Sequence, residues 1–226
     1  MFAIIPARSG SKRIKRKNIK VFRGKPIIYW VLKELKRNKH IKKIIVTSDD
    51  PKILRLSKKY GADILIKRSK KISNDYTPFQ IAINDAIKNL KISHKHSKVL
   101  AVFPCSAFIK NEYIVKATNL LKKNPTKFII GVSKYSHPIQ RAYQMKKNFL
   151  KYFNKRYELT RTQDIKESFY DAGQFCLGNS ITWQKRKVQT NALGIIIPRE
   201  RAIDIDTIED WKFAEKLSKI ILWKRK

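Results

Sequence analysis

Cysteine is scarce in this sequence, and long apolar runs are missing from it. Cys105 and Cys176 are the two cysteines, which are too few for a disulfide framework or a zinc site made of cysteines. We expect both to be reduced, buried thiols. No stretch approaches the ~20 apolar residues of a membrane-spanning helix, and the apolar segment 2–6 is too short for a signal-peptide core. We therefore expect a soluble, cytoplasmic protein.

Acidic residues are also few, and their shortage leaves a large positive charge. The chain has 52 Lys and Arg against 17 Asp and Glu, a net charge of +35. Such a balance indicates a nucleic-acid partner, but a dedicated binder usually gathers its charge on one face. Here the lysines run from Lys12 to Lys226. We interpret the excess as compositional bias, with anionic substrates attracted and RNA or DNA bound weakly.

Short apolar runs alternate with helical patterns in the first half of the chain. We predict strands at 2–5, 44–46, 64–66 and 99–103, and helices at 26–38, from 51 to 61 and at 79–90. This order predicts an α/β fold, with a doubly wound, mostly parallel sheet that helices cover on both faces. The length of 226 residues suits a single domain.

The second half of the chain is less regular. Residues 134–165 are polar, rich in Tyr and Lys and without a clean period, so we expect an excursion from the main sheet. A late strand is predicted at 193–197. Thr207 and Asp210 form a variant of the capping box, which predicts the start of a last helix with a buried stripe of Trp211, Ala214, Leu217 and Ile221.

The segment Pro6–Arg13, directly after the first predicted strand, is typical of a phosphate-binding loop. Gly10 and two serines let the backbone approach a phosphate, and Arg8 and Lys12 supply opposing charge. The spacing is neither that of a P-loop nor that of a dinucleotide fingerprint. In parallel sheets ligands bind beyond the carboxyl ends of the strands, where this loop would lie. A solvated basic turn is the alternative.

A pair of carboxylates precedes the last helix. If Asp204–Asp206 is extended, both carboxylates point to the same side and could converge on one cation. Mg²⁺ prefers oxygen ligands and shares them with substrate phosphates. The alternative is a capping pair that the helix dipole favours, and the spacing alone does not separate the two.

Two further segments, 137–141 and 171–175, carry amide, guanidinium and aromatic side chains. Gln140, Arg141, Gln174 and Phe175 are suited to a polyhydroxylated ligand with a carboxylate, because amides bind hydroxyls and Arg binds a carboxylate in two places. Neither segment is specific by itself. We expect His137 to support a loop rather than to catalyse.

The chain resembles the CMP-sialic acid synthetase family of cytidylyltransferases over nearly its whole length. The segments 3–13 and 17–20 are similar to the signature of the wider family. The segments 137–142, 159–164 and 171–175 resemble its pseudaminic acid branch, and so does the ending 204–211.

The resemblance implies a GT-A/Rossmann-like nucleotidyltransferase fold, a homodimer and Mg²⁺ as cofactor. The reaction it implies transfers CMP from CTP to the anomeric hydroxyl of an acidic nine-carbon sugar and releases pyrophosphate. Residues 134–165 would serve the dimer and the sugar site. By motif match, the triphosphate would be bound by Arg8, Ser11 and Lys12, and charge at the α-phosphate would be stabilised by Lys17. The cytidine would contact Asn18 and Arg68, and the metal would be held by Asp204 and Asp206. The sugar side would be served by Gln140, Arg161, Gln174 and Phe175.

Some residues depart from the family pattern. Ser9 and Lys15 replace a common glycine and a frequent proline, which concerns only loop stiffness. The turn 104–108 and the pair Cys176–Leu177 also differ, and we expect them near the sugar pocket, so they bear on sugar choice. The rival functions are the same transfer to N-acetylneuraminic or legionaminic acid, and a basic nucleic-acid binder on a degenerate nucleotidyltransferase scaffold.

Overall fold

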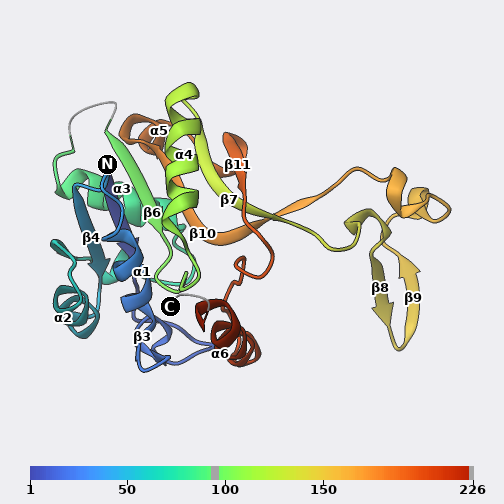
Figure 1. The fold of residues 1–226 in the computed structure, drawn as a ribbon, viewed down its shortest axis with the longest axis horizontal. Coiled ribbons are helices and arrows are strands. Elements are labelled where there is room, and N and C mark those ends of the chain that lie inside the picture. The colour runs from blue at the N-terminus through green and yellow to red at the C-terminus, as the bar shows by residue number, and fades with distance from the viewer. Residues whose placement is uncertain (93–96, 224–226) are drawn as a thin grey trace.

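A seven-stranded sheet is the centre of the fold in the computed structural model, which describes residues 1–92 and 97–223 (Figure 1). The strand order is β11-β7-β10-β6-β1-β4-β5. The strands of this sheet are β1 (Phe2–Pro6), β4 (Lys43–Ser48), β5 (Ile64–Lys67), β6 (Lys98–Val102), β7 (Phe128–Lys134), β10 (Phe169–Asn179) and β11 (Ala192–Ile196).

One strand runs against all the others in this sheet. The neighbouring pairs β1–β4, β1–β6, β4–β5 and β7–β11 are parallel, whereas β10 is antiparallel to both β6 and β7. The expected mostly parallel α/β sheet is confirmed. Because β10 is reversed, its first residues lie at the same edge of the sheet as the carboxyl ends of its neighbours.

Helices cover both faces of the sheet, as the doubly wound arrangement requires. The helices are α1 (Ile27–Leu35), α2 (Pro51–Lys59), α3 (Phe79–Asn89), α4 (Asn111–Lys123), α5 (Ser180–Lys185) and α6 (Ile208–Trp223). Residues of α1, α2 and α4 share one buried cluster with Ala3 and Ile5 of β1. Residues of α3 and α5 lie in a second buried cluster, together with Ile4 of β1. Alternate residues of β1 thus serve opposite faces.

Helix α6 belongs to a third cluster at the end of the sheet. Trp211 and Ala214 are buried there with Phe22, which lies in the small hairpin β2 (Val21–Phe22) and β3 (Lys25–Pro26). The predicted capping box is present, since the Thr207 amide donates to Asp210 Oδ2 at 2.7 Å and the Asp210 amide donates to Thr207 Oγ1 at 3.1 Å. This cap fixes the segment 203–206 just ahead of the helix.

The predicted excursion is an arm that projects from the sheet. After β7 the chain leaves the main body, forms the hairpin β8 (Tyr143–Lys146) and β9 (Phe149–Tyr152), and returns into β10 (Figure 1). Directly opposite residues of the hairpin are Tyr143 with Tyr152 and Met145 with Leu150. Opposite residues point to the same face of a hairpin, so these four side chains give the arm one apolar face.

Most of the predicted elements are confirmed within two or three residues. The first predicted helix ends at Leu35 rather than at residue 38, and the late strand is the edge strand β11. The elements α4, β7 and β10 were not predicted. Among the described residues, no helix has the length and apolar character that crossing a bilayer would need.

Candidate active site

A cavity of about 740 Å³ opens at the carboxyl ends of β1 and β6. It lies where the sequence placed the phosphate-binding loop. The reversed strand β10 contributes residues near its start, and the segment ahead of α6 closes one side. All eight residues predicted for nucleotide and metal binding line this cavity, namely Arg8, Ser11, Lys12, Lys17, Asn18, Arg68, Asp204 and Asp206.

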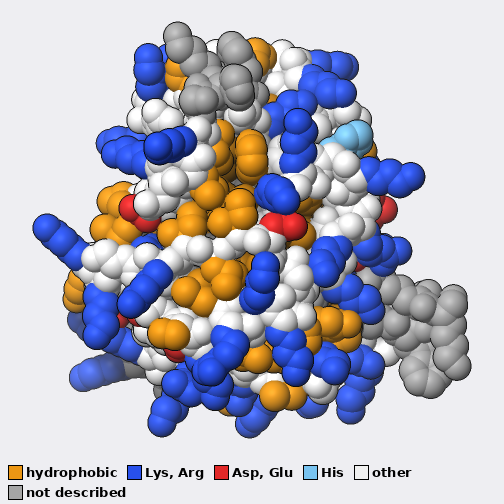
Figure 2. Space-filling view, turned by 90° about the vertical axis from the view of Figure 1, so that its left-hand side faces the viewer, with side chains coloured by type: hydrophobic (Ala, Val, Ile, Leu, Met, Phe, Trp, Pro, Cys, Tyr) orange, Lys and Arg blue, Asp and Glu red, His pale blue; other side chains and the backbone are white. Residues whose placement is uncertain are grey.

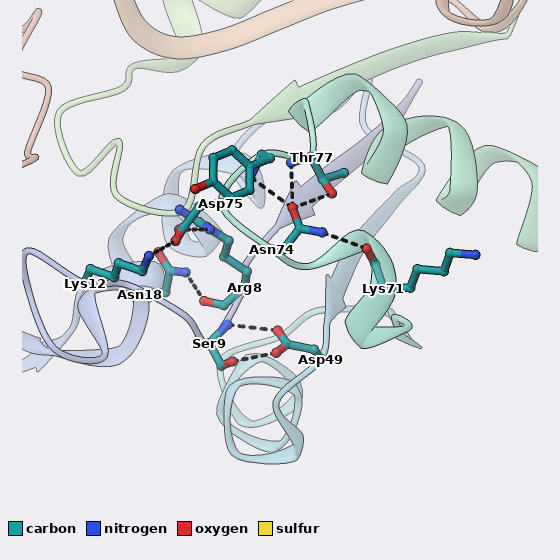
Figure 3. Close-up of polar contacts among 10 residues, drawn as sticks. Arg8, Ser9, Lys12, Asn18, Asp49, Lys71, Asn74, Asp75 and Thr77 are labelled. Carbon is teal, nitrogen blue, oxygen red and sulfur yellow. Dashed lines mark hydrogen bonds and ion pairs between the residues drawn. The ribbon is translucent and has the colours of Figure 1, made fainter.

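Polar contacts with Asp49 and Asn18 help to hold the loop after β1 in place. The Ser9 amide donates to Asp49 Oδ1 at 2.8 Å, which ties the loop to the end of β4 (Figure 3). Asn18 Nδ2 donates to the carbonyl oxygen of Arg8 at 2.8 Å, and Cys105 Sγ donates to Asn18 Oδ1 at 3.4 Å. The loop therefore has a defined shape before any ligand binds.

Asp75 pairs with two cations of this loop, Arg8 and Lys12. Arg8 NH1 contacts Asp75 Oδ1, and Lys12 Nζ lies 2.7 Å from Asp75 Oδ2 (Figure 3). The hydrogen bonds from Lys12 and then Arg8 hold the pKa of Asp75 below its ordinary value, so this carboxylate is ionised at neutral pH. Asp75 was not predicted as a site residue.

A second group of charges lies across the cavity, around Asp206. Lys17 Nζ donates to Asp206 Oδ1 at 3.0 Å and to the carbonyl oxygen of Ile205 at 2.6 Å. Arg13 NH2 lies 2.8 Å from Asp206 Oδ2. Burial acts to raise the pKa of Asp206, but the hydrogen bond and charge of Lys17, with those of Arg13, outweigh it and leave this pKa lowered.

Asp204 differs from Asp206 because burial, together with neighbouring carboxylates, raises its pKa. Limited hydration raises the pKa of Asp204 first, and the charges of Asp206 and Asp171 raise it further, against a lowering by Lys17. Gly173 has φ +61, and a Cβ there would lie 3.2 Å from Asp204 Cγ. Glycine at position 173 thus allows the left-handed backbone conformation and avoids a tight contact between a Cβ and this carboxylate.

Oxygen ligands suitable for a hard cation are gathered at this side of the cavity. Asp204, Asp206 and Asp171 all line it, although no group of three or more His, Cys, Asp or Glu side chains within 1–92 and 97–223 is arranged to hold a metal by itself. A cation here would need further ligands from substrate phosphates or water, which is how Mg²⁺ is usually bound. The donor set fits such a cation.

Part of the cavity lining is apolar, with Phe79 and Phe103 close to the buried Arg68 guanidinium in the lining. Arg68 is 5% exposed, its Nε donates to Ser73 Oγ at 2.9 Å, and burial lowers its pKa. The rings of Phe79 and Phe103 meet at a centroid distance of 5.2 Å, and both residues line the cavity. This part of the lining offers flat apolar surface beside one fixed guanidinium, which suits a nucleobase.

The four residues predicted for the sugar side do not line the cavity. Gln140 and Arg161 lie on the arm, where Gln140 Nε2 donates to Ser168 Oγ at 3.1 Å and Arg161 Nε donates to Asp164 at 2.8 Å. Gln174 and Phe175 are each 1% exposed. Gln174 donates to the carbonyl oxygen of Arg201, and Phe175 packs in the core. Their role toward a sugar stays a prediction.

The departures from the family pattern also separate in space. Cys176 and Leu177 are buried in the two core clusters and do not line the cavity, and their bearing on the sugar pocket stays a prediction. Cys105 lines the cavity, and burial raises the pKa of its thiol to about 12. Both cysteines are free, as predicted, but only Cys176 is fully buried, because Cys105 is half-buried at the cavity.

Sequence reasoning missed three features of the cavity. Asp75 belongs to a polar turn ahead of α3, and such turns resemble ordinary surface loops. Asp171 and Gly173 stood within a segment that we had assigned as a whole to sugar binding. The available signal was the isolated glycine, because a lone glycine within a strand indicates a bulge, and the register of β10 shifts between Asp171 and Cys176.

The positive charge is spread over the face of the molecule that Figure 2 shows, in agreement with the distribution of lysines along the sequence. Figure 2 shows Lys and Arg side chains scattered across the viewed face, with hydrophobic side chains between them and few acidic ones. No single basic stripe stands out on this face.

Several known proteins are similar to this chain in sequence or in fold. A family model described as cytidylyltransferase matches residues 2–221. A pseudaminic acid cytidylyltransferase from Campylobacter jejuni is 32% identical over 96% of this chain and 95% of its own length. A CMP-N,N'-diacetyllegionaminic acid synthase from Legionella pneumophila is 26% identical over 97% of each chain. The solved structure of a CMP:2-keto-3-deoxy-manno-octonic acid synthetase complexed with CTP shares the fold, with a TM-score of 0.71 over 97% of this chain and 98% of that one, at 14% identity.

Proposed function

Since the chain belongs to the cytidylyltransferase family, we propose that it transfers CMP from CTP to the anomeric hydroxyl of pseudaminic acid. The products are CMP-pseudaminic acid and pyrophosphate. The observation that carries this proposal is the cavity in which the cations of the phosphate loop face the Asp204–Asp206 pair. The name of the Campylobacter relative supports the choice of sugar. We place the reaction in the cytoplasm, where cells keep nucleoside triphosphates.

The phosphate loop and Lys17 would act on the triphosphate. Arg8, Ser11 and Lys12 would bind its oxygens, and the Lys17 ammonium would stabilise the charge that develops at the α-phosphate. In the reaction, the sugar oxygen forms a bond to the α-phosphorus, the bond from that phosphorus to the bridging oxygen breaks, and the hydroxyl proton passes to water. Such transfers depend mainly on positioning and charge neutralisation.

The apolar part of the lining would hold the nucleoside. Phe79 and Phe103 offer ring surface to the base, and Arg68 and Asn18 offer fixed donors beside it. Arg68 is held by Ser73 and Asn18 by Arg8 and Cys105, so these donors are oriented in advance. Preorganised polar groups favour the base that pairs with them and leave other bases unpaired.

Asp204 and Asp206 would hold Mg²⁺. The mutual repulsion of the carboxylates around Asp204 would be relieved by a divalent cation, and phosphate oxygens could complete the ligands. Mg²⁺ bound there would neutralise negative charge on the phosphates. Lys17 and Arg13 already bind Asp206, so both would keep this carboxylate ionised and oriented.

The arm would complete the sugar site from a second copy of the chain. Its hairpin presents an apolar face that includes Tyr143, Met145 and Leu150, which are 51%, 72% and 62% exposed. Apolar area of this kind favours burial against a partner. A homodimer would cover it, and would bring Gln140 and Arg161 of one chain near the cavity of another. This would account for Gln140 and Arg161, which lie on the arm away from the cavity of their own chain, but not for Gln174 and Phe175, which are buried in the core.

The same transfer to N-acetylneuraminic or legionaminic acid is the second candidate, which the full-length match to the Legionella synthase favours. Pyrophosphate release, measured for each nucleoside triphosphate with each of the three sugars, separates these functions. Of the nucleoside triphosphates, we expect only CTP to support the reaction. We expect kcat/KM to be at least roughly tenfold higher with pseudaminic acid than with the other two sugars, because each mismatched buried polar group costs ~1–3 kcal/mol. Equal use of the sugars would retain the enzyme class and remove the pseudaminic label.

A further inference from the structure

Two cations of the phosphate loop share one carboxylate, that of Asp75 (Figure 3). Arg8 is 38% exposed and Asp75 31%, so the cluster lies at the cavity surface where an incoming ligand can reach it. Arg8 and Lys12 come from the loop after β1, whereas Asp75 comes from the turn between β5 and α3. The contact thus joins two separate segments across the mouth of the cavity.

The turn that carries Asp75 does not depend on the Asp75 carboxylate. Its shape comes from Asn74, whose Oδ1 accepts hydrogen bonds from the amides of Tyr76 and Thr77, each at 2.9 Å. Asn74 Nδ2 donates to the carbonyl oxygen of Lys71 at 2.9 Å. Figure 3 shows this arrangement beside the Asp75 ion pairs. Asp75 can therefore release Arg8 and Lys12 while the turn keeps its hydrogen bonds.

We propose that Asp75 competes, within the same molecule, with phosphate groups for Arg8 and Lys12. This inference rests on the proposed function. In the free enzyme the carboxylate occupies both cations. A ligand that uses them must displace it, so every anion loses affinity relative to an unoccupied loop. A tethered competitor acts at high effective concentration, and it therefore remains effective inside the cavity.

The competition has different consequences for substrate and product. CTP keeps further contacts through its nucleoside, so it can bear the cost of displacing Asp75. Once the bond to the α-phosphorus is broken, pyrophosphate is no longer attached to the nucleoside. It then binds through its phosphate contacts alone. Return of Asp75 to Arg8 and Lys12 then favours release of pyrophosphate. The same competition would keep free cellular phosphates from filling the loop.

Titration calorimetry of inorganic pyrophosphate and of CTP with the wild type and Asp75→Asn tests the inference. We expect Asp75→Asn to bind pyrophosphate more tightly, on the order of tenfold, since two charge-assisted contacts no longer compete. The inhibition constant of pyrophosphate in the transfer assay should fall in parallel. Glu112→Gln is the matched control. It removes one negative charge and an ion pair to Lys110, but it lies on α4, away from the cavity, and should leave both constants unchanged.

A double-mutant cycle with Lys12→Gln sharpens the test. In the Lys12→Gln background, Asp75→Asn should gain less affinity for pyrophosphate, because one of the contested contacts is already absent. A second variant, Asp75→Ser, and the thermal unfolding of each variant serve as controls. They show whether a changed affinity comes from loss of the carboxylate or from a loop that fails to form.

The outcomes separate the inference from the proposed function. If the wild type binds CTP but Asp75→Asn and Asp75→Ser bind pyrophosphate equally or more weakly, Asp75 preorganises the loop and the inference is overturned. If the wild type binds neither CTP nor pyrophosphate, the proposed function itself is overturned, and the inference with it.

Discussion

Lys17 connects the phosphate loop to the carboxylate pair at the scale of single residues. Its side chain is 20% exposed, and its ammonium lies within hydrogen-bond distance of Asp206 and of the Ile205 carbonyl. It is therefore positioned before a ligand arrives. A preorganised charge of this kind stabilises a transition state without reorganisation during the reaction.

We expect Lys17→Ala to lower kcat and kcat/KM together, by on the order of 10²-fold or more, as for other preorganised charges. Steady-state kinetics with CTP varied at saturating sugar measures this. Lys15→Ala, at an exposed position of the same loop, is the control and should behave as wild type. A rise in the KM for CTP alone would instead make Lys17 a ground-state phosphate clamp.

Asp206→Asn tests the metal assignment. The substitution removes one charge and one oxygen ligand, so we expect activity to be nearly abolished while the fold is retained. Activity measured against Mg²⁺ concentration, with circular dichroism of the variant, is the readout. Glu209→Gln is a matched control, because this exposed carboxylate lies three residues away and outside the cavity. Near-normal turnover of Asp206→Asn at limiting Mg²⁺ would return the pair to helix capping.

The arm is the element whose role is easiest to isolate. Its apolar face is built by cross-strand pairs, and it lies outside the main sheet, so substitutions there should not disturb the core. We expect Met145→Ser with Leu150→Ser to convert a dimer into a monomer, because each removes apolar area that a partner would bury.

Sedimentation velocity measures this change in mass. A control pair, Gln144→Ser with Lys151→Ser, alters the opposite face of the same hairpin and should leave the dimer intact. If the wild type is itself a monomer at micromolar concentration, the proposed homodimer is refuted. If the Met145 and Leu150 variant stays dimeric, another surface forms the interface.

The elements that the sequence predicted are those with a clear local pattern. The strands β1, β4, β5 and β6 are short apolar runs with helical periods between them, and a parallel sheet follows from that order. The strand β10 was missed because Asp171 and Gly173 interrupt it, and its polar start reads as a loop. Its direction depends on pairing with β6 and β7, and such long-range partners leave little local signal.

The candidate site, like the fold, was predicted only where the residues concerned are close in sequence. The phosphate loop and the Asp204–Asp206 pair were predicted because each is contiguous in sequence. The Asp75 contact joins two segments that are separate in sequence, so no local spacing could indicate it. The sugar-side residues were named from a resemblance, and the structure places them on the arm and in the core rather than at the cavity.

Charge is a property of the whole molecule. A net charge of +35 that is spread over the surface attracts anions without concentrating contacts. We therefore expect binding to random RNA that is weak and that fades as salt rises toward ~0.15 M. Fluorescence anisotropy of a labelled RNA across a salt series measures this. Tight, sequence-selective binding at that salt concentration would revive a nucleic-acid-binding function.

The reversed strand β10 has a consequence for the order in which the chain folds during synthesis. The strands β6, β1, β4 and β5 lie within the first 102 residues and pair with one another, so this half can assemble early. The strand β7 pairs only with β10 and β11 among the described strands, and both follow the arm. Until residue 179 has left the ribosome, β7 has no neighbour and the cavity lacks one wall. A chain released early at the arm would expose an unpaired strand edge, which is a hazard for aggregation.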